Sequence, residues 1–312
     1  MNRLAAITGA SGFLGRRLVV SFAARGFAVR ALVRNPLPPS AWEDAPVEMV
    51  RGDLSDTEAL GRLAEGAEVV IHVAGAVKAV SEAAFLSVNA HGARAVSEAA
   101  SRAGARMVLV SSLSAREPHL SPYAASKRAG ETAAREVLGE QLSVVRPPAI
   151  YGPGDAATLD LFRAAVFSPV LPIPDSPGAR LALVFVDDAA SAIADLAQAS
   201  PGPGPFTTGG ARPLGYSWDE IAHALAAAAD RRPSLVRIPP GALLAAGGVA
   251  DWAQRLTGRP SMFTSGKARE MLHPDWSCSP ADEPPGKRAA PIDLVDGFAR
   301  SLAWYRRHAW RT

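Results

Sequence analysis

The stretch Thr8-Gly9-Ala10-Ser11-Gly12-Phe13-Leu14-Gly15 decides the fold. It lies between an apolar run at 4–8 and an amphipathic run at 13–25, where a strand and then a helix are expected. Glycines at this spacing permit a tight turn and bring the backbone close to a pyrophosphate at the helix N-terminus. A phosphate loop of the NTPase type is excluded, because no Gly-Lys-Ser/Thr follows. We therefore predict a dinucleotide site that includes Gly9, Ser11, Gly12, Phe13, Leu14 and Gly15.

Outward from this loop, short apolar runs alternate with amphipathic runs through the first half of the chain. Glycines follow each amphipathic run, where helix C-caps favour a left-handed residue. Ser55 and Glu58 predict a capping box. Strands joined by crossover helices predict an α/β fold with a doubly wound parallel sheet. The predicted strands are 4–8, 28–33, 47–51, 68–73, 106–111 and 142–146, and the predicted helices are 13–25, 56–65, 81–103 and 122–138.

The pattern becomes irregular after Gly154, and prolines become more frequent. We expect a dinucleotide-binding Rossmann domain at 1–154, to which the chain returns near 187–212, and a smaller substrate-binding domain at 155–312. In this second half we predict a strand at 181–186, a helix at 187–198 and a proline–glycine connector at 201–205. Ser217 and Glu220 predict the capped start of a helix, and a tail helix is expected at 292–308.

Composition excludes several classes of protein. The chain has 312 residues, 48% of them hydrophobic, and 33 basic against 30 acidic residues, which is too balanced for a nucleic-acid surface. The single Cys278 cannot form an intramolecular disulfide, and the histidines lack metal-ligand spacing, so no metal is expected. The chain begins with a predicted strand and has no run long enough to span a bilayer. We expect a cytoplasmic protein with no membrane partner.

The residue after the second predicted strand bears on the choice of dinucleotide. An acidic residue there would accept hydrogen bonds from the ribose 2′-hydroxyl, but the chain has Arg34 instead. A guanidinium would bind a 2′-phosphate, so NADP(H) is favoured, while NAD(H) stays open. Asp53 and Leu54, just past the third strand, are candidates for contact with the edge of the cofactor's adenine. A residue at the start of the next helix would explain Asp53 equally well.

Tyr123 and Lys127 are the candidate proton donor and its modulator. Ser121 as N-cap and Pro122 at the first helical position predict a helix that begins here, so residues four apart share one face. A nearby ammonium and a helix N-terminus both favour the phenolate, which makes a tyrosine a usable acid/base. Ser112, at the end of the fifth strand, is the candidate hydroxyl for a substrate carbonyl oxygen, ahead of Ser111 and Ser114. The alternative is a serine that satisfies strand-end backbone groups.

At this point the chain resembles the extended short-chain dehydrogenase/reductases, also called the NAD-dependent epimerase/dehydratase family. The segment 29–36 is most similar to the branch of dihydroflavonol reductases and 3β-hydroxysteroid dehydrogenases. The matching residues are the glycine loop, Gly52-Asp53-Leu54, His72-Val73-Ala74-Gly75, Asn89, Ser111-Ser112, Tyr123, Lys127, Arg146-Pro147, Tyr151-Gly152-Pro153-Gly154-Asp155 and Val186-Asp187-Asp188.

The resemblance implies further roles. Val73, Ala74 and Gly75 would line the cofactor's ribose and phosphates, Ser111 would lie at the cofactor, and Lys127 would hold the nicotinamide ribose. Pro147, Ala149 and Ile150 would lie against the nicotinamide. The alanine-rich helices at 81–103 and 122–138 would form a homodimer interface.

These residues predict an NADP(H)-dependent oxidoreductase that interconverts a carbonyl and an alcohol of a small-molecule substrate. One alternative is a nucleotide-sugar epimerase or dehydratase with tightly bound NAD. The sugar-nucleotide branch has an arginine for the diphosphate where this chain has Leu181, with Arg180 one residue out of register. The other alternative is an NADP(H)-sensing binding protein without turnover, for which Ser112, Tyr123 and Lys127 would serve no purpose.

Overall fold

The computed structural model describes residues 3–199, 202, 204–285 and 290–310. These residues divide into two compact units. Unit 1 holds the described residues of 3–147, 190–207 and 282–285, and unit 2 holds those of 148–189, 208–281 and 290–310. The domain boundary after Gly154 stays a prediction.

Unit 1 is built on a seven-stranded parallel sheet with the order β11-β6-β5-β4-β1-β2-β3. Strand order reverses between β1 and β4, which is where doubly wound folds bind ligands. The predicted α/β class and doubly wound sheet are confirmed. The strands are β1 (Leu4–Thr8), β2 (Ala28–Val33), β3 (Val47–Arg51), β4 (Val69–His72), β5 (Arg106–Val110), β6 (Leu142–Arg146) and β11 (Phe206–Thr207).

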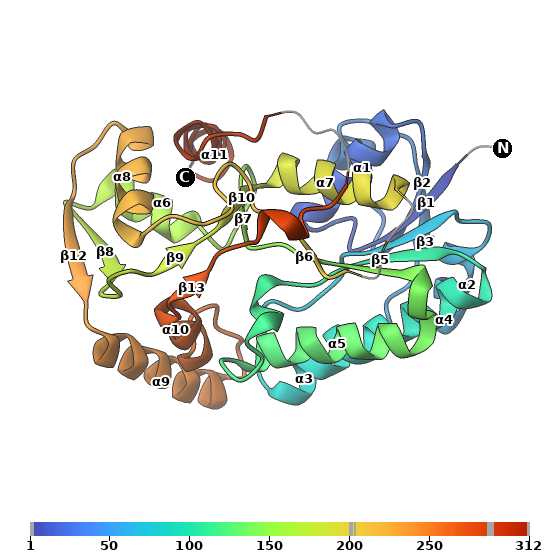
Figure 1. Ribbon diagram of the computed structural model, residues 1–312, viewed down its shortest axis with the longest axis horizontal. Helices are drawn as coiled ribbons and strands as arrows, with labels where there is room; N and C mark the ends of the chain where they lie inside the picture. Colours follow the sequence, from blue (N-terminus) through green and yellow to red (C-terminus); the bar gives the residue numbers. More distant parts are fainter. Residues whose placement is uncertain (1–2, 200–201, 203, 286–289, 311–312) are drawn as a thin grey trace. The chain divides into compact units, whose positions relative to one another are not determined.

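Helices cover both faces of this sheet (Figure 1). On one face lie α1 (Phe13–Ala24) and α7 (Val186–Gln198), joined where Arg25 donates to the Asp195 carboxylate at 2.9 Å. On the other lie α2 (Thr57–Ala64), α4 (Gly92–Arg102) and α5 (Pro122–Leu138). Because both faces are covered, every residue of β4 and β6 is buried, which explains why these strands are predominantly apolar and do not alternate between apolar and polar residues.

One prediction of a helix cap in unit 1 was wrong, and one predicted helix contains an irregular turn. Asp56, not Ser55, caps α2, with its carboxylate accepting from the Ala59 amide, while the Ser55 hydroxyl donates to the Asp53 carboxylate at 2.6 Å. The helix expected at 81–103 is instead α3 (Glu82–Leu86), a π-helical turn over Ser87–His91, and α4. The wider turn moves the Asn89 carbonyl so near α5 that a Cβ on Gly130 would lie 2.3 Å from it.

Unit 2 contains short parallel strand pairs and helices. The pairs are β10 with β7, β12 with β8, and β13 with β9. Its elements are β7 (Ala149–Tyr151), α6 (Leu159–Phe167), β8 (Val170–Pro174), β9 (Arg180–Leu181), β10 (Leu183–Phe185), α8 (Trp218–Ala229), β12 (Ser234–Ile238), α9 (Pro240–Thr257), α10 (Ser265–Leu272), β13 (Asp275–Trp276) and α11 (Leu294–His308).

The capping box of Ser217 and Glu220 is confirmed at the start of α8. The strand predicted at 181–186 is divided into β9 and β10, because Leu181 also bridges to Tyr216 and Ala182 bonds to the Trp276 carbonyl. The tail helix begins later than expected, at Leu294, where Asp293 caps it. Of the predicted connector at 201–205, residues 201 and 203 lie outside the described residues.

Candidate active site

The glycine loop has a backbone that only glycine fits. Gly9 has a φ of +70°, and a Cβ there would lie 2.6 Å from the amide nitrogen of Ala74. A Cβ on Gly15 would lie 2.0 Å from the carbonyl oxygen of Gly9, which also accepts a 2.9 Å bond from the Gly12 amide. These contacts bring the loop, the start of α1 and the end of β4 together.

The N-terminus of α1 is suited to an anion. Its N-cap, Gly12, supplies no side-chain hydrogen bond, and no acidic residue occupies the first turn. Amides of the first turn therefore keep their donors for a ligand, and the helix dipole favours negative charge. Ser11 is exposed beside them, Phe13 is half-buried and Leu14 is buried in the core. This donor set fits a pyrophosphate.

A pocket of about 470 Å³ lies at the ends of β2 and β3. Hydrogen bonds from Ser55 hold the pKa of the Asp53 carboxyl below its usual range, with a smaller contribution from the charge of Arg34. Leu54 packs against Gly92, where a Cβ would lie 2.7 Å from it, so its side chain supports α4. The lining residues are Arg34, Arg51, Gly52, Asp53, Ser55 and Asp56.

Arg51 is a second cation in this pocket that the sequence analysis did not select. It pairs in register with Val33, the residue before Arg34. The sequence places Arg51 at the end of the predicted third strand. Only the strand order, which makes β2 and β3 neighbours, shows that Arg51 lies beside Arg34.

The residues after β4 lie against the helix that carries the tyrosine–lysine pair. Val73 and Ala74 are half-buried, and the Ala74 amide donates to the Thr8 hydroxyl at 3.3 Å. A Cβ on Gly75 would lie 3.1 Å from Asn89 Oδ1 and 3.6 Å from Lys127 Nζ. Three segments far apart in sequence thus meet at Gly75.

Lys127 is buried on α5. Ser121 caps this helix by accepting from the Ala124 amide, and Pro122 occupies its first turn as predicted. The Lys127 ammonium donates to the Val110 carbonyl at 2.8 Å. Burial lowers the pKa of Lys127 to about 8, while the carboxylate of Glu131 acts in the opposite direction.

Tyr123 is half-buried one turn earlier, and its ring lies edge-on to Phe85, with 6.1 Å between centroids. Asn89 of the π-helical turn connects this region to the loop after β4. Its side-chain amide donates to Ser126 at 2.9 Å, and Ser126 donates to the Tyr123 carbonyl at 2.7 Å. The Asn89 oxygen accepts from the Ala76 amide at 2.8 Å.

The two serines at the end of β5 have different environments. Ser112 is half-buried and accepts from the Ser114 amide at 3.2 Å, which caps the short 3-10 helix Leu113–Arg116 and leaves the Ser112 proton for donation. Ser111 is buried and donates to the Glu131 carboxylate at 2.5 Å. Arg146 also binds Glu131, through Nε at 2.8 Å. The buried network of Ser111, Glu131 and Arg146 was missed by the sequence analysis.

The three residues expected at the nicotinamide belong to different units. Pro147 ends the first segment of unit 1, and its carbonyl accepts from the Leu113 amide at 2.8 Å. Ala149 and Ile150 belong to β7 of unit 2, in register with Leu183 and Val184. Their roles at a cofactor stay predictions.

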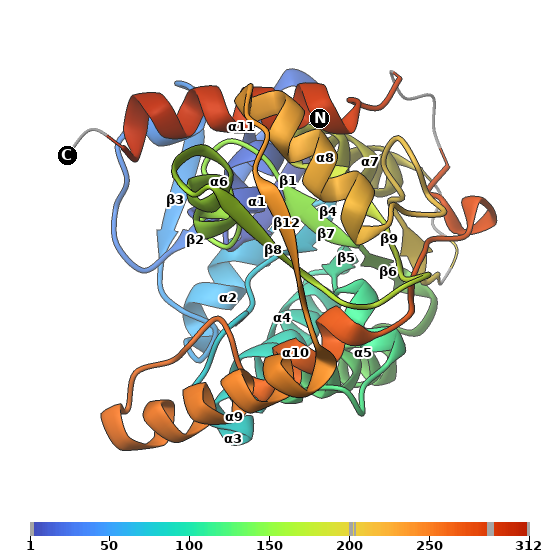
Figure 2. The same ribbon diagram turned by 90° about the vertical axis from the view of Figure 1, so that its left-hand side faces the viewer.

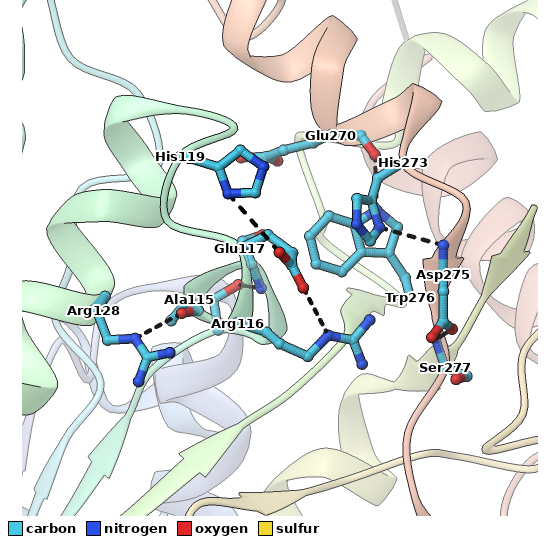
Figure 3. A network of polar contacts seen from close by, with 12 residues as sticks. Ala115, Arg116, Glu117, His119, Arg128, Glu270, His273, Asp275, Trp276 and Ser277 are labelled. Atoms are coloured by element: carbon cyan, nitrogen blue, oxygen red, sulfur yellow. Dashed lines mark hydrogen bonds and ion pairs between the residues drawn. The ribbon is translucent and has the colours of Figure 1, made fainter.

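Figure 3 shows polar contacts in the segment that follows Ser112. Arg128 of α5 donates to the Ala115 carbonyl at 3.0 Å, and Glu117 lies 3.6 Å from Arg116 and 3.9 Å from His119. The Arg128 bond joins the 3-10 helix to α5, and the Glu117 contacts lie within the segment itself. In unit 2, the Trp276 indole donates to the Glu270 carbonyl at 2.7 Å, and the His273 and Trp276 rings lie 4.6 Å apart.

His72 is buried and stays neutral. Its Nδ1 lies 2.7 Å from the Thr8 hydroxyl, and burial, followed by the charge of Lys127, lowers its pKa to about 3. Within the part of the chain that the structure describes, no cluster of three or more His, Cys, Asp or Glu residues could hold a metal. Among the same residues, no helix is long and apolar enough to cross a bilayer.

Comparison with known proteins shows the family of the chain. Residues 5–208 match the model of the NAD dependent epimerase/dehydratase family. The chain is 49% identical over 305 residues to a ceramide reductase of Caulobacter vibrioides, which covers 98% of this chain and 95% of the relative. It is 31% identical over 171 residues to a putative dihydroflavonol 4-reductase of Synechocystis, covering 48% of this chain and 50% of that protein.

A solved dTDP-glucose 4,6-dehydratase of Streptomyces venezuelae, with NAD and TYD bound, has the same fold, with a TM-score of 0.73 and 20% identity over 98% of this chain and 97% of that one. The family match covers more than half of the chain, and the full-length relative agrees with it. The chain belongs to the NAD dependent epimerase/dehydratase family and is an NAD(P)-dependent oxidoreductase of the extended short-chain dehydrogenase/reductase type.

Proposed function

We propose that this protein is an NADPH-dependent reductase whose substrate is the ketone corresponding to the secondary alcohol of a ceramide-type lipid. The observation that carries the proposal is the 49% identity to a ceramide reductase along 98% of the chain. Because this match covers 98% of the chain, it includes the residues of unit 2, whereas the match to the dihydroflavonol 4-reductase covers 48%.

Three side chains of unit 1 would perform the proton chemistry. Ser112 would donate a hydrogen bond to the substrate carbonyl oxygen and orient it. Tyr123 would give its phenolic proton to that oxygen as negative charge develops there. Lys127, held by the Val110 carbonyl, would favour the phenolate that remains. When bound, the reduced nicotinamide supplies the hydride that reaches the carbonyl carbon.

NADPH is proposed as the reductant because Arg34 and Arg51 both line the pocket at the ends of β2 and β3. Two guanidiniums would pair with a 2′-phosphate through charge-assisted hydrogen bonds. The Asp53 carboxylate in the same pocket stays ionised because Ser55 hydrogen-bonds to it, so the two guanidiniums would hold the phosphate against its repulsion.

Two observations count against the alternatives. A diphosphate-sugar substrate would need a free cation near Leu181, but Arg180 lies 3.4 Å from the Glu220 carboxylate, which Arg212 also binds. A cofactor sensor without turnover would have no use for a buried lysine beside a tyrosine on the same helical face.

The substrate proposal is tested with purified protein, NADPH and a long-chain N-acyl amino ketone in mixed micelles. We expect NADPH oxidation together with formation of the secondary alcohol, identified by mass spectrometry. Tyr123→Phe is the control for enzymatic turnover. Conversion of UDP-sugars, with co-purified NAD that resists dialysis, would instead establish the epimerase alternative.

The cofactor proposal is tested by measuring dissociation constants for NADPH and NADH. We expect tighter binding of NADPH, with the preference reduced or reversed in Arg34→Asp and reduced in Arg51→Ala. A wild-type preference for NADH of tenfold, about 1.4 kcal/mol, would refute it.

A further inference from the structure

Helix α9 of unit 2 exposes large apolar side chains over its whole length. Val249 and Leu256 are each 66% exposed, Trp252 is 62% exposed and Leu244 is 38% exposed. Only Leu243 and Gly247 of this 18-residue helix are buried. Large apolar residues are usually scattered singly on protein surfaces, so a helix that exposes several of them marks an interaction site.

The exposed side chains share one face of α9. At 100° per residue, Leu244, Val249, Trp252 and Leu256 fall within one sector, together with small residues at 241, 245 and 248. We call this sector, defined by the four large side chains, the apolar face of α9.

The opposite side of α9 binds its own unit. A Cβ on Gly247 would lie 2.7 Å from the Cα of Ser265 at the start of α10, and Asp251 accepts from the Ser265 amide. Gln254 accepts from the Ser261 amide at 2.8 Å. Figure 2 shows α9 and α10 side by side. The helix is therefore fixed on one side, which leaves the apolar face available.

The charges around the apolar face are mostly positive. On α9 and the residues directly after it, 240–260, the basic residues are Arg255 and Arg259, and the one acidic residue is Asp251. On α10, which lies against the other side of α9, Lys267 pairs with Glu270 at 3.3 Å. Asp251 is half-buried, and its carboxylate is engaged by the Ser265 amide. Arg255 and Arg259 are exposed and form no ion pair with any residue that the structure describes. Such a surface is complementary to a partner that has an apolar interior and negative charges at its boundary with water.

These charges favour a lipid surface over a second copy of the chain. A two-fold contact through the apolar face would bring Arg255 and Arg259 of both copies into one interface without a free carboxylate. Lipid phosphates would neutralise the same arginines. The helix cannot span the bilayer, since no described helix meets the length and hydropathy required, so it would lie along the boundary.

We propose that α9 docks this protein on anionic bilayers, with Leu244, Val249, Trp252 and Leu256 inserted at the headgroup–acyl boundary and Arg255 and Arg259 bound to lipid phosphates. This proposal revises the expectation that the protein has no membrane partner. It goes beyond the proposed function, and it stands on α9 whether or not the substrate is a lipid. If both proposals hold, docking brings the enzyme to the bilayer in which a long-chain ketone resides.

The test is sedimentation of the full-length protein with vesicles of phosphatidylcholine alone or mixed with phosphatidylglycerol. We expect partitioning onto the mixed vesicles at least tenfold stronger than onto phosphatidylcholine, weakened by added salt. Trp252→Ser with Leu256→Ser, and separately Arg255→Glu with Arg259→Glu, should each reduce partitioning at least tenfold.

Matched controls come from exposed positions on α11. Val295→Ser removes an exposed apolar side chain, and Arg306→Glu with Arg307→Glu reverses two exposed charges. Both variants should partition as the wild type does. NADPH affinity and far-UV circular dichroism of every variant verify that it is folded.

Three results would overturn the proposal. These are no preference of the wild type for phosphatidylglycerol vesicles, equal partitioning of the α9 and α11 variants, and a wild-type oligomer that Trp252→Ser dissociates without lipid. Vesicle binding without reduction of the lipid ketone would leave the docking surface intact and refute the proposed function. Reduction of that ketone in detergent without vesicle binding would support the proposed function and refute the docking surface.

Discussion

Lys127 combines a buried position with a charge that the proposed chemistry requires. Its pKa of about 8 lies below the ordinary 10.5, so the folded protein holds this proton less tightly than the unfolded chain does. Burying the charge therefore destabilises the fold below pH 8, and this cost disappears as pH rises from about 8 to 10.5. At neutral pH the protein therefore keeps the Lys127 charge, although burying it lowers the stability of the fold.

Tyr123 and Lys127 should differ in what their loss removes. Tyr123→Phe keeps the ring against Phe85 but deletes the hydroxyl, so NADPH should still bind while turnover falls by roughly 10² to 10⁴. Lys127→Met removes the charge that favours the phenolate and also the expected ribose contact, so NADPH affinity should fall together with the rate. Binding titrations and steady-state kinetics on the same preparations measure both. Near-full activity of Tyr123→Phe would show that the proton comes from elsewhere.

His72 should make the fold sensitive to acid. Its folded pKa of about 3 lies below the ordinary 6.5, so the stability gained by keeping it neutral is complete above pH 6.5 and is lost as pH falls toward 3. Replacing it with glutamine should flatten the fall in melting temperature between pH 7 and pH 4.

The control for this prediction is His91→Gln, a change at an exposed histidine of the same unit, which should follow the wild-type curve. Parallel curves for wild type and His72→Gln would contradict the prediction.

The sequence predicted that Tyr123 and Lys127 lie close together, but it did not predict side-chain contacts between residues far apart in the chain. Tyr123 and Lys127 are one helical turn apart, so helix geometry alone places them on one face. The bond from Ser111 to Glu131 and the ion pair of Glu131 with Arg146 depend on how α5 packs across β5 and β6. No periodicity in the sequence encodes that packing.

At the scale of elements, the β1–α1 connection depends on the absence of side chains. Gly15→Ala should destabilise unit 1 and abolish dinucleotide binding, because its Cβ would lie 2.0 Å from the Gly9 carbonyl oxygen, which cannot move without disrupting the loop. Gly61→Ala, inside α2 with nothing within 4 Å of the added Cβ, should instead stabilise by up to about 1 kcal/mol. Denaturant unfolding and NADPH titration compare the two, and equal effects would contradict the prediction.

The strands of the unit 1 sheet were predicted well, and the short strands of unit 2 were not. The predicted bounds of β1, β2, β3 and β6 agree with the structure, because each is a short run rich in β-branched or other apolar residues between polar or glycine-containing segments. Strand β12 of unit 2 has no buried residue and no alternation, so no period identifies it. The π-helical turn over Ser87–His91 was missed because helical periodicity on either side is the same with or without one extra residue.

For the whole molecule, the homodimer stays a prediction, and the structure indicates the α5 surface through which it would form. Ala125, Ala129 and Ala133 follow one another at four-residue spacing on α5, each only half-buried in one chain. Small residues permit close approach of a second helix. We expect light scattering at micromolar concentration to give twice the chain mass, and Ala129→Glu to give the single mass. A wild-type monomer would refute the dimer.

Strand β11 returns the chain to the sheet of unit 1 long after the other six strands, pairing Phe206 with Val145 and Thr207 with Arg146. During synthesis, β6 therefore leaves the ribosome as an open edge that stays unpaired until residues near 207 emerge. An open edge recruits other strands, including those of neighbouring nascent chains. Residues 148–189 must be made in that interval, so translation speed across this segment sets how long the growing sheet is vulnerable to aggregation.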